Sequence, residues 1–80
     1  MTMRAFYRCN LCGKEFGTFM TGLVNAEMIM TSFIIDYPEL NKDKSIRPKT
    51  LHYCGNGDEG IADFIGFKME VEEEDSAEND

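Results

Sequence analysis

The chain has 80 residues, of which 42% are hydrophobic, and its 8 basic and 15 acidic side chains give a net charge of −7. This length allows one domain, the apolar content excludes a wholly disordered chain, and so small a core usually needs a metal or disulfides to stabilise it. The charge is unevenly distributed, because residues 70–80 contain seven acids and no base. We therefore expect a near-neutral single domain over residues 1–71 and an acidic, disordered tail over residues 72–80.

The first motif is a C-x-x-C-G sequence over residues 9–13. Residues 4–8 are rich in aromatic side chains and predict a strand that leads into Cys9. The spacing lets two thiolates face one ion, and the glycine lets the backbone turn below the second sulfur. Residues 14–19 could pair back on the first strand and complete a knuckle hairpin. A redox dithiol is the alternative for Cys9 and Cys12, but no βαβ pattern surrounds them.

The hydrophobic period changes to that of a helix between Thr21 and Tyr37. One side of this helix steps by three and four residues through Phe19, Leu23, Ala26, Met30, Phe33 and Tyr37, and the other side carries Thr21, Asn25, Ser32 and Asp36. The β-branched Ile29, Ile34 and Ile35 leave a strand near residues 28–35 as the alternative. The apolar surface is wider than one stripe, so the helix is either deeply packed or covered by a partner.

The second half of the chain predicts a basic loop and further strands. Residues 38–50 read as a loop that holds both prolines and the bases Lys42, Lys44, Arg47 and Lys49. Residues 51–53 predict a short strand, and the three glycines of residues 55–60 indicate a turn. Apolar and polar residues alternate over 65–72, which predicts a half-buried strand. A helix over residues 61–69 is the alternative, and Gly66 argues against it.

Cys54 is the one remaining cysteine and, like Cys12, it is followed by glycine. The sole histidine, His52, lies two residues earlier, and positions i and i+2 of a strand point to the same face. Cys9, Cys12, His52 and Cys54 therefore form a candidate tetrahedral site, for which structural Zn²⁺ is the expected metal. Two alternatives stay open, a buried apolar thiol at Cys54 and a fourth contact from Asp58, water or another chain.

The two half-sites resemble those of zinc-ribbon and zinc-knuckle proteins. The resemblance covers these half-sites rather than the whole chain, and Leu51 stands where the fourth cysteine of a paired C-x-x-C would lie. It implies a small α+β, zinc-ribbon-like domain with a knuckle β-hairpin, one central helix and C-terminal strands. It also implies a partner within nucleic-acid machinery, since zinc ribbons often serve there.

No catalytic motif accompanies the candidate metal site. The sequence contains neither HExxH nor the H-x-E and C-x-x-C pair of deaminases, and 80 residues leave little wall for a substrate pocket. We therefore expect a non-enzymatic, zinc-stabilised module that binds a protein partner, with a homodimer through the apolar 19–37 stripe as one form. The rivals are direct nucleic-acid binding through the 42–49 loop and nucleic-acid mimicry by the acidic tail.

The sequence also predicts a compartment. No signal-peptide hydrophobic region precedes the first cysteine, and no apolar run is long enough to cross a membrane. An odd number of cysteines with metal-ligand spacing favours thiolates in a reducing compartment over a disulfide framework. We therefore expect a cytoplasmic protein.

Overall fold

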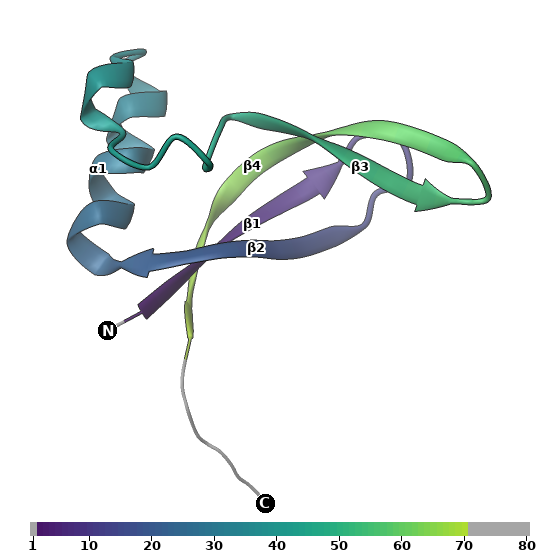
Figure 1. Ribbon diagram of the computed structural model, residues 1–80, viewed down its shortest axis with the longest axis horizontal. Coiled ribbons are helices and arrows are strands. Elements are labelled where there is room, and N and C mark those ends of the chain that lie inside the picture. Colours follow the sequence, from purple (N-terminus) through teal and green to yellow (C-terminus); the bar gives the residue numbers. More distant parts are fainter. Residues whose placement is uncertain (1, 71–80) are drawn as a thin grey trace, which may run out of the picture.

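The computed structural model describes residues 2–70, which form one antiparallel four-stranded sheet and one α-helix (Figure 1). The first hairpin joins β1 (Thr2–Cys9) to β2 (Glu15–Gly22), and α1 (Leu23–Ile34) follows it. A short 3₁₀ helix, η1 (Pro38–Leu40), and a loop lead to the second hairpin, formed by β3 (Lys49–Gly55) and β4 (Asp58–Glu70). The fold is therefore mixed α+β, as expected, and the structure adds that it is mostly β. The acidic segment over residues 72–80 lies outside the described residues.

The strand order β2-β1-β4-β3 places β4 between the two strands that carry the cysteines. Cys9 at the end of β1 pairs with Ala62, and His52 of β3 pairs with Gly60. The β4 members of these two pairs, Gly60 and Ala62, are only two positions apart. The register therefore brings the two half-sites of the sequence to the same end of the sheet, although a helix and a loop separate them along the chain.

The strand β4 is much longer than the period-two pattern over residues 65–72 indicates. Of the expected turn over residues 55–60, only Asn56 and Gly57 form the turn itself, and both have positive φ (56° and 83°). An Asn-Gly pair with these angles is the preferred two-residue hairpin turn, so pairing resumes at Asp58. The helical alternative over residues 61–69 is wrong, because that stretch is strand throughout.

The expected helix is confirmed as α1, and the strand alternative over residues 28–35 is wrong. The helix begins at Leu23 rather than at Thr21, because Thr21 and Gly22 still pair with β1. Its buried side chains are Ala26, Ile29 and Ser32.

The face that α1 buries is rotated from the expected one. Met30 and Phe33 are half-buried, and Leu23 and Tyr37 are exposed. The sequence pattern predicts Ser32 on the polar side of the helix because serine is polar, whereas the structure buries it. Its hydroxyl donates to the carbonyl oxygen of Ile29 (2.6 Å), so its polarity is satisfied within the helix and its small size suits close packing.

The core lies between α1 and the face of the sheet to which Ala5, Tyr7 and Cys9 of β1 point. Its buried members are Ala5, Tyr7, Cys9, Ile29, Ile46 and Ala62, and the rings of Phe16, Phe33, Phe64 and Phe67 pack around them. Ile46 belongs to the loop that joins η1 to β3, and the sequence pattern did not mark it as buried. Its burial anchors this loop against the sheet.

Tyr7 ties the same loop to β1. Its hydroxyl donates to the carbonyl oxygen of Arg47 (2.7 Å) and accepts from the N–H of Arg47 (3.1 Å). Asn41 closes the loop from the other side, because its side-chain amide donates to the carbonyl oxygen of Ile46 (2.8 Å). Within residues 2–70, the one α-helix is too short to cross a membrane.

Candidate metal centre

The structure brings Cys9, Cys12, His52 and Cys54 together at one end of the sheet. One ligand atom of each residue lies within 4.8 Å of the others, and this group could hold a metal ion. Cys9 ends β1, Cys12 lies in the turn between β1 and β2, and the other two lie on β3. Asp58, which the sequence left as an alternative fourth contact, is not a member of this group.

The turn after β1 has the hydrogen bonds that a knuckle needs. The N–H of Gly13 donates to the carbonyl oxygen of Cys9 (2.9 Å), and the N–H of Cys9 donates to the carbonyl oxygen of Lys14 (2.9 Å). The N–H of Leu11 also points at the Cys9 sulfur, at 3.4 Å. Gly13 has φ 79°, the left-handed conformation that glycine adopts most readily. The glycine of the C-x-x-C-G sequence therefore has the predicted role.

The second half-site repeats this arrangement on β3. His52 and Cys54 lie on the same face of the strand, and the Cys54 sulfur lies 3.6 Å from Nδ1 of His52. Gly55 follows with φ 88°, so the two Cys-Gly pairs turn in the same way. The imidazole of His52 stacks on Phe16, with ring centroids 4.7 Å apart and planes at 15°. This stacking fixes the plane of the ring, and Nδ1 faces the sulfurs of Cys12 and Cys54.

The distances between ligand atoms suit a tetrahedral zinc site. Zn–S bonds near 2.3 Å and Zn–N bonds near 2.05 Å place two sulfurs about 3.8 Å apart, and a sulfur and a nitrogen about 3.6 Å apart. The Cys9 and Cys54 sulfurs are 3.6 Å apart, and the Cys12 sulfur lies 3.6 Å from Nδ1 of His52. A set of three thiolates and one imidazole is also a common donor set for Zn²⁺.

The sulfurs differ in their affinity for protons. The pKa of Cys9 is lowered to about 6, mainly by hydrogen bonding to the N–H of Cys12 and also by contacts with His52, Leu11 and Cys54, against the opposing effect of burial. The pKa of Cys54 is raised to about 12, mainly by burial and also by its hydrogen bonds to Cys12 and Cys9. Cys9 is therefore the thiol of this pair that loses its proton more readily, and Cys54 the one that keeps it. Binding of a divalent cation to all three sulfurs would displace that proton.

Gly60 is a part of the site that sequence reasoning missed. A Cβ atom at this position would lie 2.7 Å from the Cys9 sulfur and 2.8 Å from the Cβ atom of Leu11. Both distances are shorter than side chains allow, so only glycine lets the backbone of β4 pass this close to the sulfur. The glycine-rich pattern over residues 55–60 places Gly60 in a turn instead. The Asn-Gly turn marks the hairpin that contains Gly60, but its simple register would place Gly60 opposite Tyr53. An irregularity between Tyr53 and Gly55 shifts the partner of Gly60 to His52, and no local signal in the sequence marks that shift.

Comparison with known proteins gives no match. No protein-family model matches the chain, and no curated protein and no solved structure gives a significant match. The interpretation of this cluster therefore depends on its geometry and its donor atoms.

Proposed function

We propose that this chain is a zinc-stabilised, zinc-ribbon-like interaction module that binds a protein partner and has no enzymatic activity. The observation that carries the proposal is the convergence of three cysteines and one histidine within 4.8 Å. Four protein ligands would complete the tetrahedral coordination of Zn²⁺ and leave no position for a reactive water, which is the property of structural zinc sites.

A structural role also suits the position of the cluster in the fold. The ligands link the turn of the first hairpin to β3, which is an edge strand that pairs only with β4. The large side chains around this end are exposed, as Leu11, Leu51, Tyr53 and Ile61 show. Apolar burial therefore contributes little here, and a bound metal would hold the two hairpins together.

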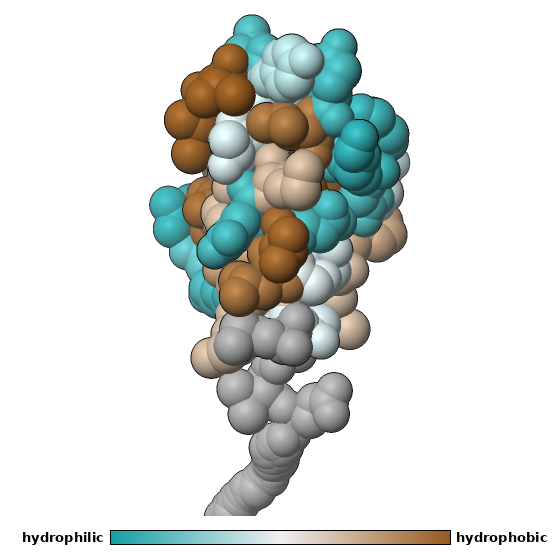
Figure 2. Space-filling view, turned by 90° about the vertical axis from the view of Figure 1, so that its left-hand side faces the viewer, coloured by the Kyte–Doolittle hydropathy of each residue, from teal (hydrophilic) through white to brown (hydrophobic). Residues whose placement is uncertain are grey.

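Exposed apolar side chains support a protein partner. Val24 near the start of α1 is 72% exposed, Ile34 at its end is 81% exposed, and Ile35, which follows Ile34, is also exposed. Figure 2 views the molecule from the α1 side and shows apolar patches separated by polar side chains. Such surfaces on a small domain are typical of binding sites.

The metal part of this proposal is tested on the full chain. Native mass spectrometry should find one zinc ion per chain, and a strong chelator should unfold the protein. A His52→Ala variant should bind zinc more weakly, because one of four ligands is lost. A purified chain that folds stably without metal, or a His52→Ala variant with unchanged affinity, would contradict the proposed role of the cluster.

The partner part is tested separately. The zinc-loaded chain should retain a protein partner from host extract after nuclease treatment and in high salt, because an apolar interface is insensitive to both. Sedimentation of the purified chain distinguishes a homodimer from a partner of another sequence. Loss of all binding after nuclease treatment would instead favour direct nucleic-acid binding.

A further inference from the structure

The strand β3 has seven residues, and in the described part of the chain it pairs only with β4. One hydrogen bond shows how its backbone is turned, because the N–H of Phe64 donates to the carbonyl oxygen of Pro48 (2.9 Å). Backbone groups alternate in direction along an antiparallel ladder, so those of Lys49, Leu51 and Tyr53 point away from β4. We name this row of outward N–H and C=O groups the β3 edge.

The β3 edge is more regular than the other open edges of the sheet formed by residues 2–70. Its pairing with β4 runs without a shift from Lys49 to Tyr53. On the opposite edge of the sheet, the register of β2 shifts between its partners Arg4 and Phe6 of β1. Where β4 extends beyond β3, its own register shifts opposite Phe6 and Tyr7. Such irregularities protect a strand from further pairing, and the β3 edge has none over these residues.

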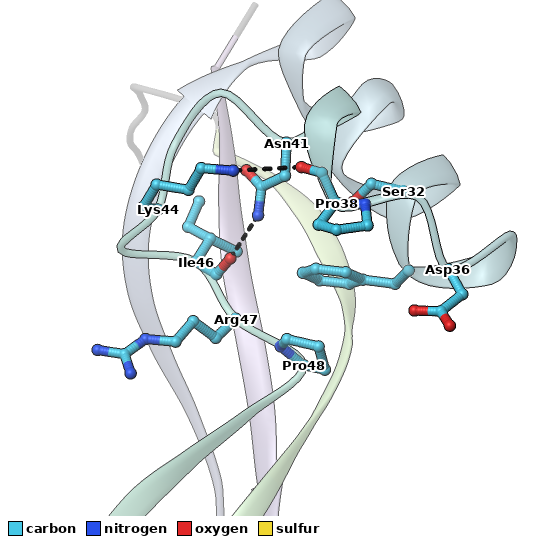
Figure 3. Close-up of a pocket in the computed structure, with 9 residues that line it drawn as sticks. Ser32, Asp36, Pro38, Asn41, Lys44, Ile46, Arg47 and Pro48 are labelled. Carbon is cyan, nitrogen blue, oxygen red and sulfur yellow. Dashed lines mark hydrogen bonds between the residues drawn. The ribbon is translucent and has the colours of Figure 1, made fainter.

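The loop before β3 is held on the α1 side of the sheet and does not cover the β3 edge. Ile46 is buried in the core there, and the side-chain amide of Asn41 donates to its carbonyl oxygen (2.8 Å; Figure 3). Figure 3 also shows Pro48 where the loop passes into β3, with the side chain of Arg47 extended away from it. The carbonyl oxygen of Pro48 is bonded to β4, so the open edge begins at Lys49.

The side chains along the β3 edge lie on the face of the sheet opposite α1. Strand alternation places Lys49, Leu51 and Tyr53 there, because the metal-ligand residues of β3 point to the core side. Leu51 is 62% exposed and Tyr53 is 71% exposed. Their cross-strand partners on β4, in chain order of β3, are Asp63, Ile61 and Glu59. The β3 edge is therefore bordered by a charged row, an aliphatic row and an aromatic row.

This pattern is complementary to itself about a two-fold axis at Leu51. When two β3 strands pair in antiparallel orientation around this residue, Lys49 of each copy lies opposite Tyr53 of the other. Every outward N–H and C=O group of the β3 edge then meets a partner. The centre becomes an unbroken apolar row, in which Ile61 and Leu51 of one copy are followed by Leu51 and Ile61 of the second.

The charges of the outer rows agree with the same register. The members of each outer row would be, in order, Asp63 and Lys49 of one copy and Tyr53 and Glu59 of the other. No like charges are neighbours in this row, because the ammonium of Lys49 pairs with Asp63 and its methylene stem meets the ring of Tyr53. A register centred on His52 would instead bring the two imidazoles together and leave Lys49 opposite Gly55.

We propose that two copies of this chain pair through their β3 edges, centred on Leu51, and form one continuous antiparallel sheet. The inference rests on the proposed function, in that it names the protein partner as a second copy. The two-fold match of the rows favours a second copy, because a partner of another sequence would not require it. A contact one strand wide is smaller than the roughly 800 Å² per partner of a standard interface, so we expect a dissociation constant in the micromolar range or above.

Sedimentation of the full zinc-loaded chain from about 1 μM to about 1 mM should show a reversible monomer–dimer equilibrium. Leu51→Glu places two carboxylates opposite each other at the axis and should weaken dimerisation at least about ten-fold. Its matched control is Ile34→Glu, the same charge change on an exposed aliphatic residue of α1, which should leave the equilibrium unchanged. A chain that stays monomeric throughout, or a dimer disrupted by Ile34→Glu and not by Leu51→Glu, would overturn the proposal.

Amide hydrogen exchange tests the β3 edge without any substitution, so it decides the question even if Leu51→Glu does not fold. The amides of Lys49, Leu51 and Tyr53 should exchange more slowly in concentrated than in dilute protein, because they gain acceptors only in the dimer. The amides of Thr50 and His52 face β4 and should be protected equally at both concentrations. Equal exchange of the three outward amides at both concentrations contradicts the proposed pairing.

A nuclear Overhauser contact between backbone hydrogens fixes the register. Lys49 and Tyr53 are four positions apart on one strand, which separates their backbones by about 13 Å within a chain. A contact between them in the concentrated sample therefore joins two copies, as pairing around Leu51 requires. Its absence from a sample that sediments as a dimer means that the assigned register is wrong.

The remaining outcomes separate this inference from the proposed function. A zinc-loaded chain that stays monomeric and retains a protein from host extract refutes the pairing of two copies while the proposed function stands. If the outward amides of β3 are protected only after that protein is added, the β3 edge pairs with a different chain and the proposal is wrong. A metal-free chain that still dimerises through the β3 edge supports the pairing and contradicts the proposed role of zinc.

Discussion

The two ends of the sheet are stabilised in different ways. At the α1 end, aromatic rings and Ile29 fill the space between the helix and the sheet, with the rings of Phe33 and Phe64 5.2 Å apart and nearly perpendicular. At the opposite end, four metal-ligand side chains converge while Leu51 and Tyr53 remain exposed. One end gains its free energy from many small contacts, whereas under the proposed function the other depends on four candidate ligands that would act together.

This difference predicts that the two ends respond differently to mutation. Loss of one contact in a packed core leaves the other contacts in place, so the free energy of unfolding falls in proportion. Loss of one ligand in a tetrahedral site weakens the binding of the metal as a whole. The variants below compare the two ends, from the largest expected effect to the smallest.

Cys9→Ser should have the largest effect. Cys9 is buried and belongs to both the core and the ligand group, so its loss removes a metal ligand and places a hydroxyl among apolar side chains. We expect loss of zinc and of cooperative thermal unfolding, as measured by mass spectrometry and circular dichroism. The control is Cys12→Ser, because the exposed Cys12 is not part of the core. Retention of both zinc and cooperative unfolding by Cys9→Ser would contradict this interpretation.

Ile29→Ala tests the packed end. The side chain of Ile29 is fully buried between α1 and the sheet, and its truncation should lower the free energy of unfolding by about 2–5 kcal/mol. Zinc affinity of the folded protein should stay unchanged, since the cavity lies at the other end. Denaturant unfolding and competition with a zinc indicator measure the two quantities. A large loss of zinc affinity would show that the two ends are coupled.

Gly60→Ala makes the converse change at the metal-ligand end. The added methyl group would lie 2.7 Å from the Cys9 sulfur, so the sulfur or β4 must move, at a cost of about 1–3 kcal/mol. Because the sulfur is displaced, zinc affinity should fall together with stability. Gly22→Ala is the control, since a Cβ atom there meets nothing within 4 Å. Unchanged zinc affinity in Gly60→Ala would show that the site tolerates this displacement.

Tyr7→Phe should have the smallest effect of the four. It keeps the buried ring and removes the hydroxyl that both donates to and accepts from the backbone of Arg47. We expect a loss of about 1–2 kcal/mol in the free energy of unfolding. Faster hydrogen exchange at the amide of Arg47 should accompany it, because that N–H loses its acceptor. Unchanged exchange would mean that the loop is held by Ile46 and Asn41 alone.

The ligand residues could be predicted because their spacing alone limits the geometry. Two cysteines separated by two residues can reach one ion in a tight turn, and His52 and Cys54 share a face of any extended strand. The helix was also predictable in position, since its period of three and four differs from that of a strand. These features depend on neighbours in the sequence.

The features that could not be predicted depend on contacts distant in the sequence. Ser32 is buried because it lies on the same face of α1 as Ala26 and Ile29, and the apolar pattern does not indicate that this face packs against the sheet. Ile46 is buried because Tyr7 and Asn41 hold its loop against β1. Gly60 is required because a Cβ atom there would lie 2.7 Å from the Cys9 sulfur. Cys9 lies 51 positions earlier in the sequence but is adjacent across the sheet through the Cys9–Ala62 pairing.

The pairing of β4 with both β1 and β3 has a consequence for how the protein can vary. Cys9 and His52 are positioned by two β4 residues, Ala62 and Gly60, rather than by the long segment that connects them. Inserting one residue between these two positions would turn one half-site to the opposite face of the sheet and separate the ligands. The length of the connection through α1 and η1, by contrast, does not enter the spacing of the site. The spacing between Gly60 and Ala62 is therefore constrained by the site, whereas the length of the segment between the two hairpins is not.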